Sequence, residues 1–239
     1  MRILITNDDG VGASQLPQLI RWCQKIGDVT TVVPKFEQSG KSHGIEIHKP
    51  FEAKQVELEP GLTVWTVDST PADCVRFAIL GLHLEFDLVI SGVNRGLNIG
   101  ADIMYSGTVG AACEAVNLGV KAIALSTPPK NYDLATEQLD AVFAFIQRHN
   151  LLQRNNIYNI NIPADPKGIR ITRQGGPYYS DDFNPEENHM YRPCGKPIWV
   201  DSDDDTLDTD ATLHGFISIT PLTVERTNHS VYQALKCIQ

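Results

Sequence analysis

Short apolar runs separated by polar turns divide the first two thirds of the chain into alternating elements. Nearly uninterrupted apolar runs occur at 3–5, 29–33, 87–91 and 122–126. Runs that are continuous rather than alternating are typical of strands in a parallel sheet that is covered on both faces. These four segments are therefore predicted to be buried parallel strands.

Helical spacing of apolar residues appears between those strands. The predicted helices cover 16–26, 70–80, 109–118 and 134–150. The first ends at Gly27, and the second begins with Thr70 as a capping residue followed by a proline. Strands at 156–162 and 215–222, shorter antiparallel strands around 45–47 and 62–67, and a terminal helix at 230–238 complete the expectation.

This alternation predicts an α/β fold that is Rossmann-like, with a mostly parallel sheet and helices on both faces. After Gly168 the composition shifts to Gly, Pro, Asp and Tyr with little periodicity. We interpret that stretch as an extended C-terminal hairpin or arm that reaches a partner subunit. The expected organisation is one domain over 1–239, with a core at about 1–165 and an oligomerisation region at about 166–239.

Charge and cysteine content narrow the classes of function. The 20 basic and 29 acidic residues give a formal net charge of -9, which argues against binding to a nucleic-acid duplex. The five cysteines are scattered and form no C-x-x-C pair, as in a reduced cytoplasmic protein. We found no signal peptide and no apolar run of membrane-spanning length, so we expect a cytoplasmic protein without membrane contact.

Two adjacent carboxylates follow the first predicted strand. Asp8 and Asp9 stand between Asn7 and Gly10, where the carboxyl end of a parallel strand commonly meets a ligand. Adjacent carboxylates repel each other, and a divalent cation such as Mg²⁺ or Mn²⁺ removes that cost. The alternative is an ordinary turn in which the Asn and Asp side chains cap the backbone.

Further polar groups leave the same predicted edge of the sheet. Ser39 and Asn94 follow the second and third strands, and a hydroxyl and an amide oxygen suit the same kind of ion. Ser106, Gly107 and Thr108 open a helix, whose free N–H groups can receive phosphate. Helix capping and turn-forming asparagines are the alternative explanations, but the shared edge favours a site.

Several long motifs resemble the SurE (survival protein E) family of metal-dependent nucleoside monophosphate phosphatases. The resemblance runs through nearly the whole chain. The segments that carry it are 7–10 (NDDG), 38–40 (QSG), 70–75 (TPADCV), 91–94 (SGVN), 105–112 (YSGTVGAA), 159–163 (NINIP) and 218–222 (SITPL).

The resemblance implies residue roles, a cofactor and an activity. One divalent ion per subunit, Mg²⁺ or Mn²⁺, would be held by Asp8, Asp9, Ser39 and Asn94. The phosphate side would consist of Asn98, Ser106, Gly107 and Thr108, and the catalytic residues would be Asp8 and Asp9. The implied enzyme is a hydrolase of the 5′-nucleotidase type, and the implied assembly is a homodimer or homotetramer.

The chain departs from the family pattern at three places, and the last two of them bear on substrate preference rather than on chemistry. Thr6 stands where the family usually has Ser, Asp68 and Ser69 replace a more usual Gly, and Phe86 replaces Pro. The sequence leaves open the preferred base, the choice between 5′ and 3′ phosphates, and hydrolysis of polyphosphate. It also leaves open whether water or Asp8 is the nucleophile, and whether the loop residue His43 transfers a proton.

Other classes of function fit the pattern less well. A dinucleotide-dependent oxidoreductase needs G-x-G-x-x-G after the first strand, and residues 8–12 do not supply it. Haloacid-dehalogenase-like phosphatases use acids two positions apart, whereas these are adjacent. A non-enzymatic phosphoacceptor or nucleotide-binding signalling module also has paired acids there, but it would be about half as long and would not need the glycine-rich loop at 92–110.

Overall fold

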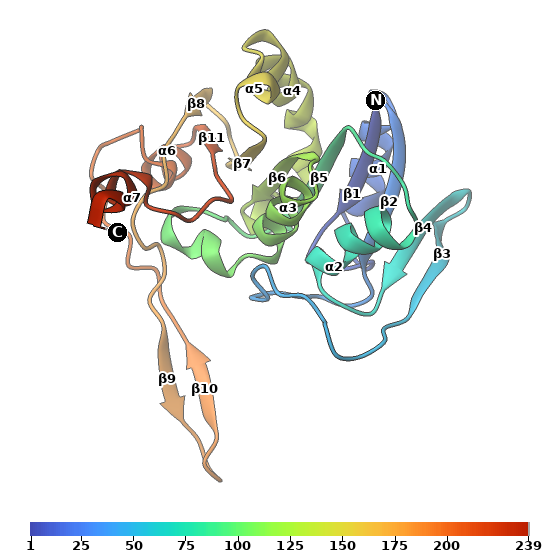
Figure 1. Cartoon of the computed structure of the whole chain (residues 1–239), viewed down its shortest axis with the longest axis horizontal. Helices are drawn as coiled ribbons and strands as arrows, with labels where there is room; N and C mark the ends of the chain where they lie inside the picture. Colours follow the sequence, from blue (N-terminus) through green and yellow to red (C-terminus); the bar gives the residue numbers. More distant parts are fainter. Residues whose placement is uncertain (239) are drawn as a thin grey trace.

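A computed structural model describes residues 1–238 and contains one large twisted sheet (Figure 1). The sheet has nine strands. From edge to edge they are β3 (Ala53–Glu59), β4 (Leu62–Val67), β2 (Asp28–Pro34), β1 (Arg2–Thr6), β5 (Leu88–Arg95), β6 (Lys121–Thr127), β7 (Ile157–Asn161), β11 (Ile217–Pro221) and β8 (Ile169–Ile171).

Most neighbouring strands in this sheet are parallel. The pairs from β4 through β2, β1, β5 and β6 to β7 all run in the same direction. The exceptions are β3 against β4 and β11 against β7, which are antiparallel. The mostly parallel Rossmann-like sheet expected from the sequence is confirmed.

Helices cover both faces because successive side chains of a buried strand point to opposite sides. Ile3 and Ile5 pack in the cluster that includes α1 (Leu16–Cys23) and α4 (Leu139–Arg148). Leu4 belongs to the cluster formed with α2 (Pro71–Arg76) and α3 (Gly107–Asn117). These three residues of β1 are fully buried, so both faces of the central strand are covered.

The central position of β1 decides where functional loops meet. β1 lies between β2 and β5, and Ile5 and Thr6 pair in register with Ile90 and Ser91. Because the three strands are parallel, the segments that follow Thr6, Pro34 and Arg95 all leave the same edge of the sheet.

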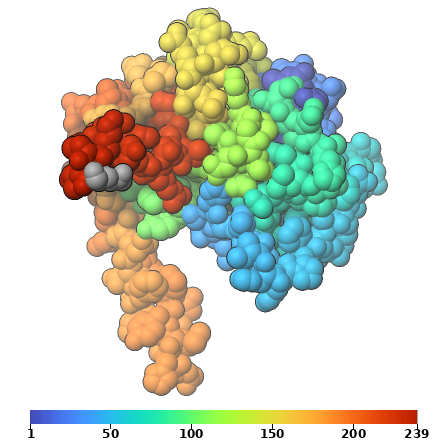
Figure 2. All heavy atoms as spheres, in the orientation of Figure 1, coloured from blue at the N-terminus to red at the C-terminus, as the bar shows by residue number. Residues whose placement is uncertain are grey.

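The C-terminal region adds an arm to this body. A two-stranded hairpin of β9 (Asp182–Pro185) and β10 (Tyr191–Cys194) projects as a narrow extension (Figures 1 and 2). The expected hairpin is confirmed. The remaining elements are the π-helix η1 (Phe77–Gly81), the 3-10 helices η2 (Gly100–Tyr105), η3 (Pro129–Gln138) and η4 (Lys236–Ile238), and the helices α5 (Leu151–Arg154), α6 (Asp208–Leu213) and α7 (His229–Leu235).

The structure corrects three expectations about local structure. Ile45 and Ile47 belong to an exposed loop rather than a strand. The helix expected from 134 begins only at Leu139, because the preceding residues form η3. β5 continues to Arg95, so the glycine-rich loop starts later than predicted. None of the helices within 1–238 is both long and apolar enough to span a bilayer.

Candidate active site

The turn after β1 is closed by the side chain of Asn7. Its Oδ1 accepts the N–H of Gly10 at 3.0 Å, and its Nδ2 donates to the carbonyl of Gly10 at 3.1 Å. Gly10 has a φ of +81°, and a Cβ there would lie 2.9 Å from the carbonyl carbon of Phe36. The turn therefore needs glycine both for its conformation and for its contact with the next loop.

Asp8 is a buried acid held by the first turn of α3. Only 5% of the residue is exposed, and its Oδ1 accepts a hydrogen bond from the hydroxyl of Thr108. Burial raises the pKa of Asp8 to about 6, the neighbouring charge of Asp9 adds to the rise, and the Thr108 bond opposes it. Asp8 is thus a carboxylate whose negative charge is poorly compensated.

Asp9 is less buried and receives two hydrogen bonds. Its Oδ2 accepts the backbone N–H of Arg95 at 3.0 Å and the hydroxyl of Tyr132 at 3.1 Å. Burial raises the pKa of Asp9, and both hydrogen bonds oppose that rise. Tyr132 lies on η3, and no sequence pattern connected it with the site.

The loop that carries Ser39 contacts the acidic pair. The backbone N–H of Gln38 donates to the carbonyl of Asp8 at 2.7 Å. The Ser39 hydroxyl donates to Glu37 at 2.6 Å, which leaves its oxygen able to accept or ligate. Ser39 and Asp9 line one cavity of about 630 Å³, which we call the acidic cavity. Its other lining residues include Glu37, Arg95, Pro129, Tyr132 and Asp133.

Asn94 lies near the end of β5, one residue before the Arg95 N–H that contacts Asp9. Its Nδ2 donates to the carbonyl of Gly96 at 2.9 Å, so its amide oxygen is free to act as a ligand. The structure therefore brings the segments that carry all four expected metal ligands, the end of β5 and the loops after β1 and β2, together at one edge of the sheet.

The residues present fit a hard divalent cation. Within 1–238 no lysine, arginine or histidine forms an ion pair with Asp8 or Asp9, and the only nearby cation that lowers the pKa of Asp9 is Arg95. Two carboxylates with a hydroxyl and an amide oxygen are the donor types that Mg²⁺ and Mn²⁺ accept. Within the same described residues, no group of three or more His, Cys, Asp or Glu is placed so that it could hold a metal ion.

The N-terminus of α3 packs directly against Asp8. Ser106 caps the helix, its Oγ accepting the N–H of Val109 at 3.1 Å. A Cβ on Gly107 would lie 3.0 Å from the Cβ of Asp8. The Thr108 hydroxyl is fully buried and is directed to Asp8. A role for Thr108 in direct phosphate binding stays a prediction.

Asn98 belongs to a buried amide network. Its N–H donates to Oδ1 of Asn161 at 2.9 Å, and its Nδ2 donates to Oγ of Ser126 at 2.7 Å. Its carbonyl accepts the amide groups of Asn159 and Asn161, both at 2.8 Å. The network fixes the backbone of the loop between β5 and η2, and a role of Asn98 in phosphate binding stays a prediction.

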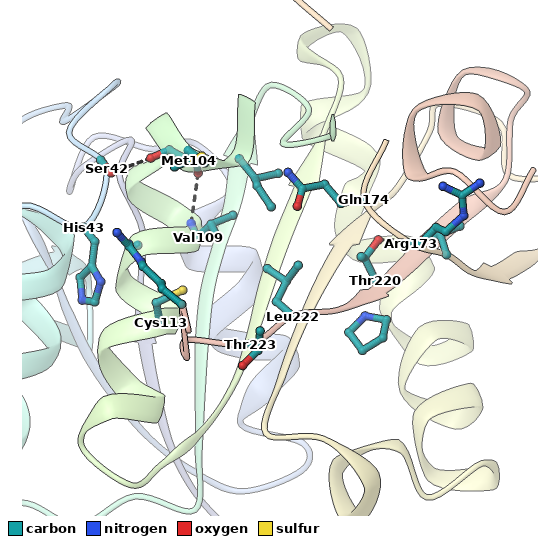
Figure 3. Close-up of a pocket in the computed structure, with 16 residues that line it drawn as sticks. Ser42, His43, Met104, Val109, Cys113, Arg173, Gln174, Thr220, Leu222 and Thr223 are labelled. Atoms are coloured by element: carbon teal, nitrogen blue, oxygen red, sulfur yellow. Dashed lines mark hydrogen bonds between the residues drawn. The ribbon is translucent and has the colours of Figure 1, made fainter. Parts of the chain in front are cut away.

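His43 is engaged away from the acidic pair. Its Nε2 lies 2.6 Å from the buried carboxylate of Glu114, which also accepts Nη1 of Arg76 at 2.8 Å. His43 and Ser42 line a cavity of about 430 Å³ with Val109, Cys113 and residues near Leu222 (Figure 3). This cavity shares no lining residue with the acidic cavity, so the structure does not bring His43 to the wall that holds Asp9 and Ser39.

Known proteins resemble the chain over almost its full length. A family model described as survival protein SurE matches residues 3–181. The protein named 5′-nucleotidase SurE from Pelotomaculum thermopropionicum is 37% identical, and the match covers 99% of this chain and 94% of that protein. Its namesake from Desulforudis audaxviator is 35% identical over 99% of this chain and 96% of its own length.

A solved structure has the same fold. The crystal structure of the SurE protein from Aquifex aeolicus superposes with a TM-score of 0.82 at 29% sequence identity. The superposition covers 100% of this chain and 99% of that one. The similarity thus includes the C-terminal region as well as the parallel sheet.

Proposed function

The chain belongs to the SurE family, and on that premise we propose that it is a metal-dependent 5′-nucleotidase that hydrolyses nucleoside monophosphates to nucleoside and phosphate. The observation that carries the proposal is the buried Asp8, packed against the N-terminus of α3 while its neighbour Asp9 lines an open cavity. The relatives bear the name of an enzyme, which gives no support to a non-enzymatic phosphoacceptor module.

One divalent ion, Mg²⁺ or Mn²⁺, would be held by Asp8, Asp9, Ser39 and Asn94. When bound, such an ion supplies Lewis-acid polarisation of a phosphoryl oxygen. The raised pKa values of Asp8 and Asp9 support this assignment, because a cation would relieve the cost of burying the ionised carboxylate of Asp8 beside that of Asp9.

The protein's own groups would orient the phosphate and stabilise its charge. The backbone N–H groups of Gly107 and Thr108 stand at the positive end of α3, beside Asp8. Ser106 and Asn98 complete the proposed phosphate side. Asp8 would act either as orienting ligand and base or as nucleophile, and its fixed contact with Thr108 is compatible with both roles.

We further propose that residues 166–239 mediate assembly into a homodimer or homotetramer in the cytoplasm. The arm exposes large apolar side chains that the body of the chain does not cover, among them Phe183, Met190 and Tyr191. Such exposure is typical of a surface that contacts another chain. All five cysteines are free thiols, as expected in a reducing compartment.

A phosphate-release panel tests the proposed activity. The purified protein would be assayed with several 5′- and 3′-nucleoside monophosphates and with polyphosphate, in Mg²⁺, in Mn²⁺ and in excess chelator. We expect release from at least one 5′-monophosphate that stops on chelation and returns when the ion is restored. Release from none of the monophosphates, or release that chelation leaves unchanged, would refute the proposal.

A further inference from the structure

A second cavity adjoins the acidic cavity. It has a volume of about 520 Å³ and lies between the loop after β5, the start of η3 and the base of the arm. Pro129 lines both cavities, and Arg95 of the acidic cavity is followed directly by Gly96 of the second one. The two cavities are therefore neighbours, and the second one lies beside the cavity that Asp9 lines.

The walls of this second cavity are aromatic and apolar. Its lining includes Leu97, Tyr105, Tyr178 and Tyr179, together with three prolines. We call it the tyrosine cavity. Flat rings and prolines favour contact with a planar ring, because every nucleobase presents a π-face that can stack on an aromatic side chain.

The charges in the tyrosine cavity disfavour a phosphate. Asp102 and Asp181 line it, and no Lys, Arg or His is among the described residues that do so. The cavity drawn in Figure 3 is the opposite case, since Arg173, Arg226 and His43 line it without any carboxylate. The tyrosine cavity therefore suits the uncharged part of a ligand whose anionic end lies elsewhere.

Backbone hydrogen bonds hold the tyrosines near the site. The N–H of Tyr179 donates to Oδ2 of Asp102 at 2.8 Å, and the N–H of Ala101 donates to the carbonyl of Gly176 at 3.1 Å. The rings of Tyr178 and Tyr179 lie 5.9 Å apart between centroids. Tyr105 directly precedes Ser106, so a ring projects from the same segment that begins α3.

We propose that the tyrosine cavity is the nucleoside subsite, in which Tyr105 and Tyr179 contact the base of a nucleoside monophosphate. The proposal rests on the proposed function, because the phosphate of the same substrate is assigned to the acidic pair and the start of α3. It makes Tyr105 and Tyr179 residues that recognise the base, and it assigns the base of the arm to the substrate site.

Two substrates separate base recognition from phosphate chemistry. AMP carries a base, whereas ribose 5-phosphate presents the same 5′-phosphate on a sugar without one. For Tyr105→Ala and Tyr179→Ala we expect kcat/KM for AMP to fall about tenfold or more, mainly through KM. The value for ribose 5-phosphate should change less than about twofold.

Conservative and remote variants provide the controls. Tyr105→Phe and Tyr179→Phe keep the ring and should retain most of the wild-type KM for AMP. Tyr232→Ala removes an equally exposed tyrosine from α7, outside the cavity, and should leave both substrates unchanged. Circular dichroism of each variant would identify any loss of folding.

A binding measurement keeps the two proposals distinguishable. Adenosine has no phosphate, so its titration into the chelated protein by calorimetry reports on the subsite without turnover. We expect adenosine to bind the wild type and to bind both alanine variants at least fivefold more weakly. Equal losses for AMP and ribose 5-phosphate, or adenosine binding that the alanine variants leave intact, would overturn the subsite. A wild type that hydrolyses neither phosphate but binds adenosine through the tyrosines would instead refute only the proposed activity.

Discussion

The hydroxyl of Thr108 donates a hydrogen bond to Oδ1 of Asp8, although the two residues lie 100 positions apart in the chain. Thr108 is in the first turn of α3, and Asp8 directly follows the turn residue Asn7 after β1. The contact therefore connects the proposed metal side of the site with the proposed phosphate side. It also places a neutral donor against the most buried acid of the pair.

Thr108→Val tests this contact, because valine keeps the shape of threonine and has a methyl group in place of the hydroxyl. The hydroxyl lowers the pKa of Asp8, so its loss should raise that pKa further. Catalysis by ionised Asp8 then predicts that the acidic limb of the pH profile of kcat/KM moves to higher pH. At neutral pH the loss of this hydrogen bond should lower kcat/KM by an amount equivalent to about 1 to 3 kcal/mol of transition-state stabilisation.

The matched control for that change is Thr212→Val. Thr212 is also buried and donates to Oγ of Ser218 at 2.9 Å, outside the acidic cavity. Thr212→Val should lower the free energy of unfolding about as much as Thr108→Val does, but it should leave the pH profile of kcat/KM unchanged. A profile that shifts equally in both variants would contradict a specific role for Thr108.

Asp8→Asn should stabilise the metal-free protein at neutral pH. The folded pKa of Asp8 is about 6, above its ordinary value of 3.8. Above pH 6 the folded state therefore bears the cost of an ionised buried carboxylate, and that cost disappears as pH falls toward 3.8. The gain from Asp8→Asn should approach about 3 kcal/mol near pH 7.5 and vanish near pH 4.

Urea unfolding in excess chelator at the two pH values measures this difference. Asp28→Asn, which alters an exposed aspartate at the start of β2, provides the control and should change little. Added Mn²⁺ should raise the stability of the wild type and reverse the order. Lower stability of Asp8→Asn than of wild type at both pH values would be incompatible with a costly buried charge.

Asp9→Asn should weaken binding of the ion, because it keeps an oxygen ligand but removes one of two negative charges. Activity should fall at limiting Mn²⁺ and recover in part at high Mn²⁺. Asp133→Asn changes the charge of the same acidic cavity without touching the pair, and its Mn²⁺ dependence should stay close to wild type. Indistinguishable Mn²⁺ curves for the two variants would remove Asp9 from the ligand set.

Asp208 connects the C-terminal region with the loop after β5. Its buried carboxylate accepts the N–H of Gly100 at 3.1 Å and that of Gly175 at 2.8 Å. Asp208→Asn places an amide donor among these N–H groups, so we expect a loss of about 2 kcal/mol of stability and a higher KM. Asp204→Asn, at a partly exposed aspartate of the same region, is the control, and equal stability of the two variants would contradict the prediction.

The parallel strands could be predicted because their apolar runs are continuous. Once β1, β2 and β5 are recognised, parallel pairing alone brings Asn94 at the end of β5 to the same edge as the loops with Asp8 and Ser39. The alternation of apolar and polar residues predicts strands less well. Ile45 and Ile47 alternate with polar residues, but no neighbouring strand pairs with them, and 71% of Ile47 is exposed.

Side-chain contacts between distant segments could not be predicted from local patterns. The Tyr132 hydroxyl reaches Asp9 from 123 residues away, and no periodicity marks it. Asp208 lies in the stretch after Gly168, where the sequence shows little periodicity, although it begins the short helix α6. Sequence motifs that resemble a family lead to the proposed ligands, but the groups that hydrogen-bond to those residues depend on tertiary packing.

Manganese binding and phosphate release measured in the same samples test the central claim most directly. Bound Mn²⁺ would be counted by electron paramagnetic resonance while phosphate release from AMP is followed across a Mn²⁺ titration. We predict that one ion binds per chain and that the rate rises in proportion to the bound fraction, with both signals weakened in Asp9→Asn. Full phosphate release from protein that holds no bound ion after chelation would contradict the account.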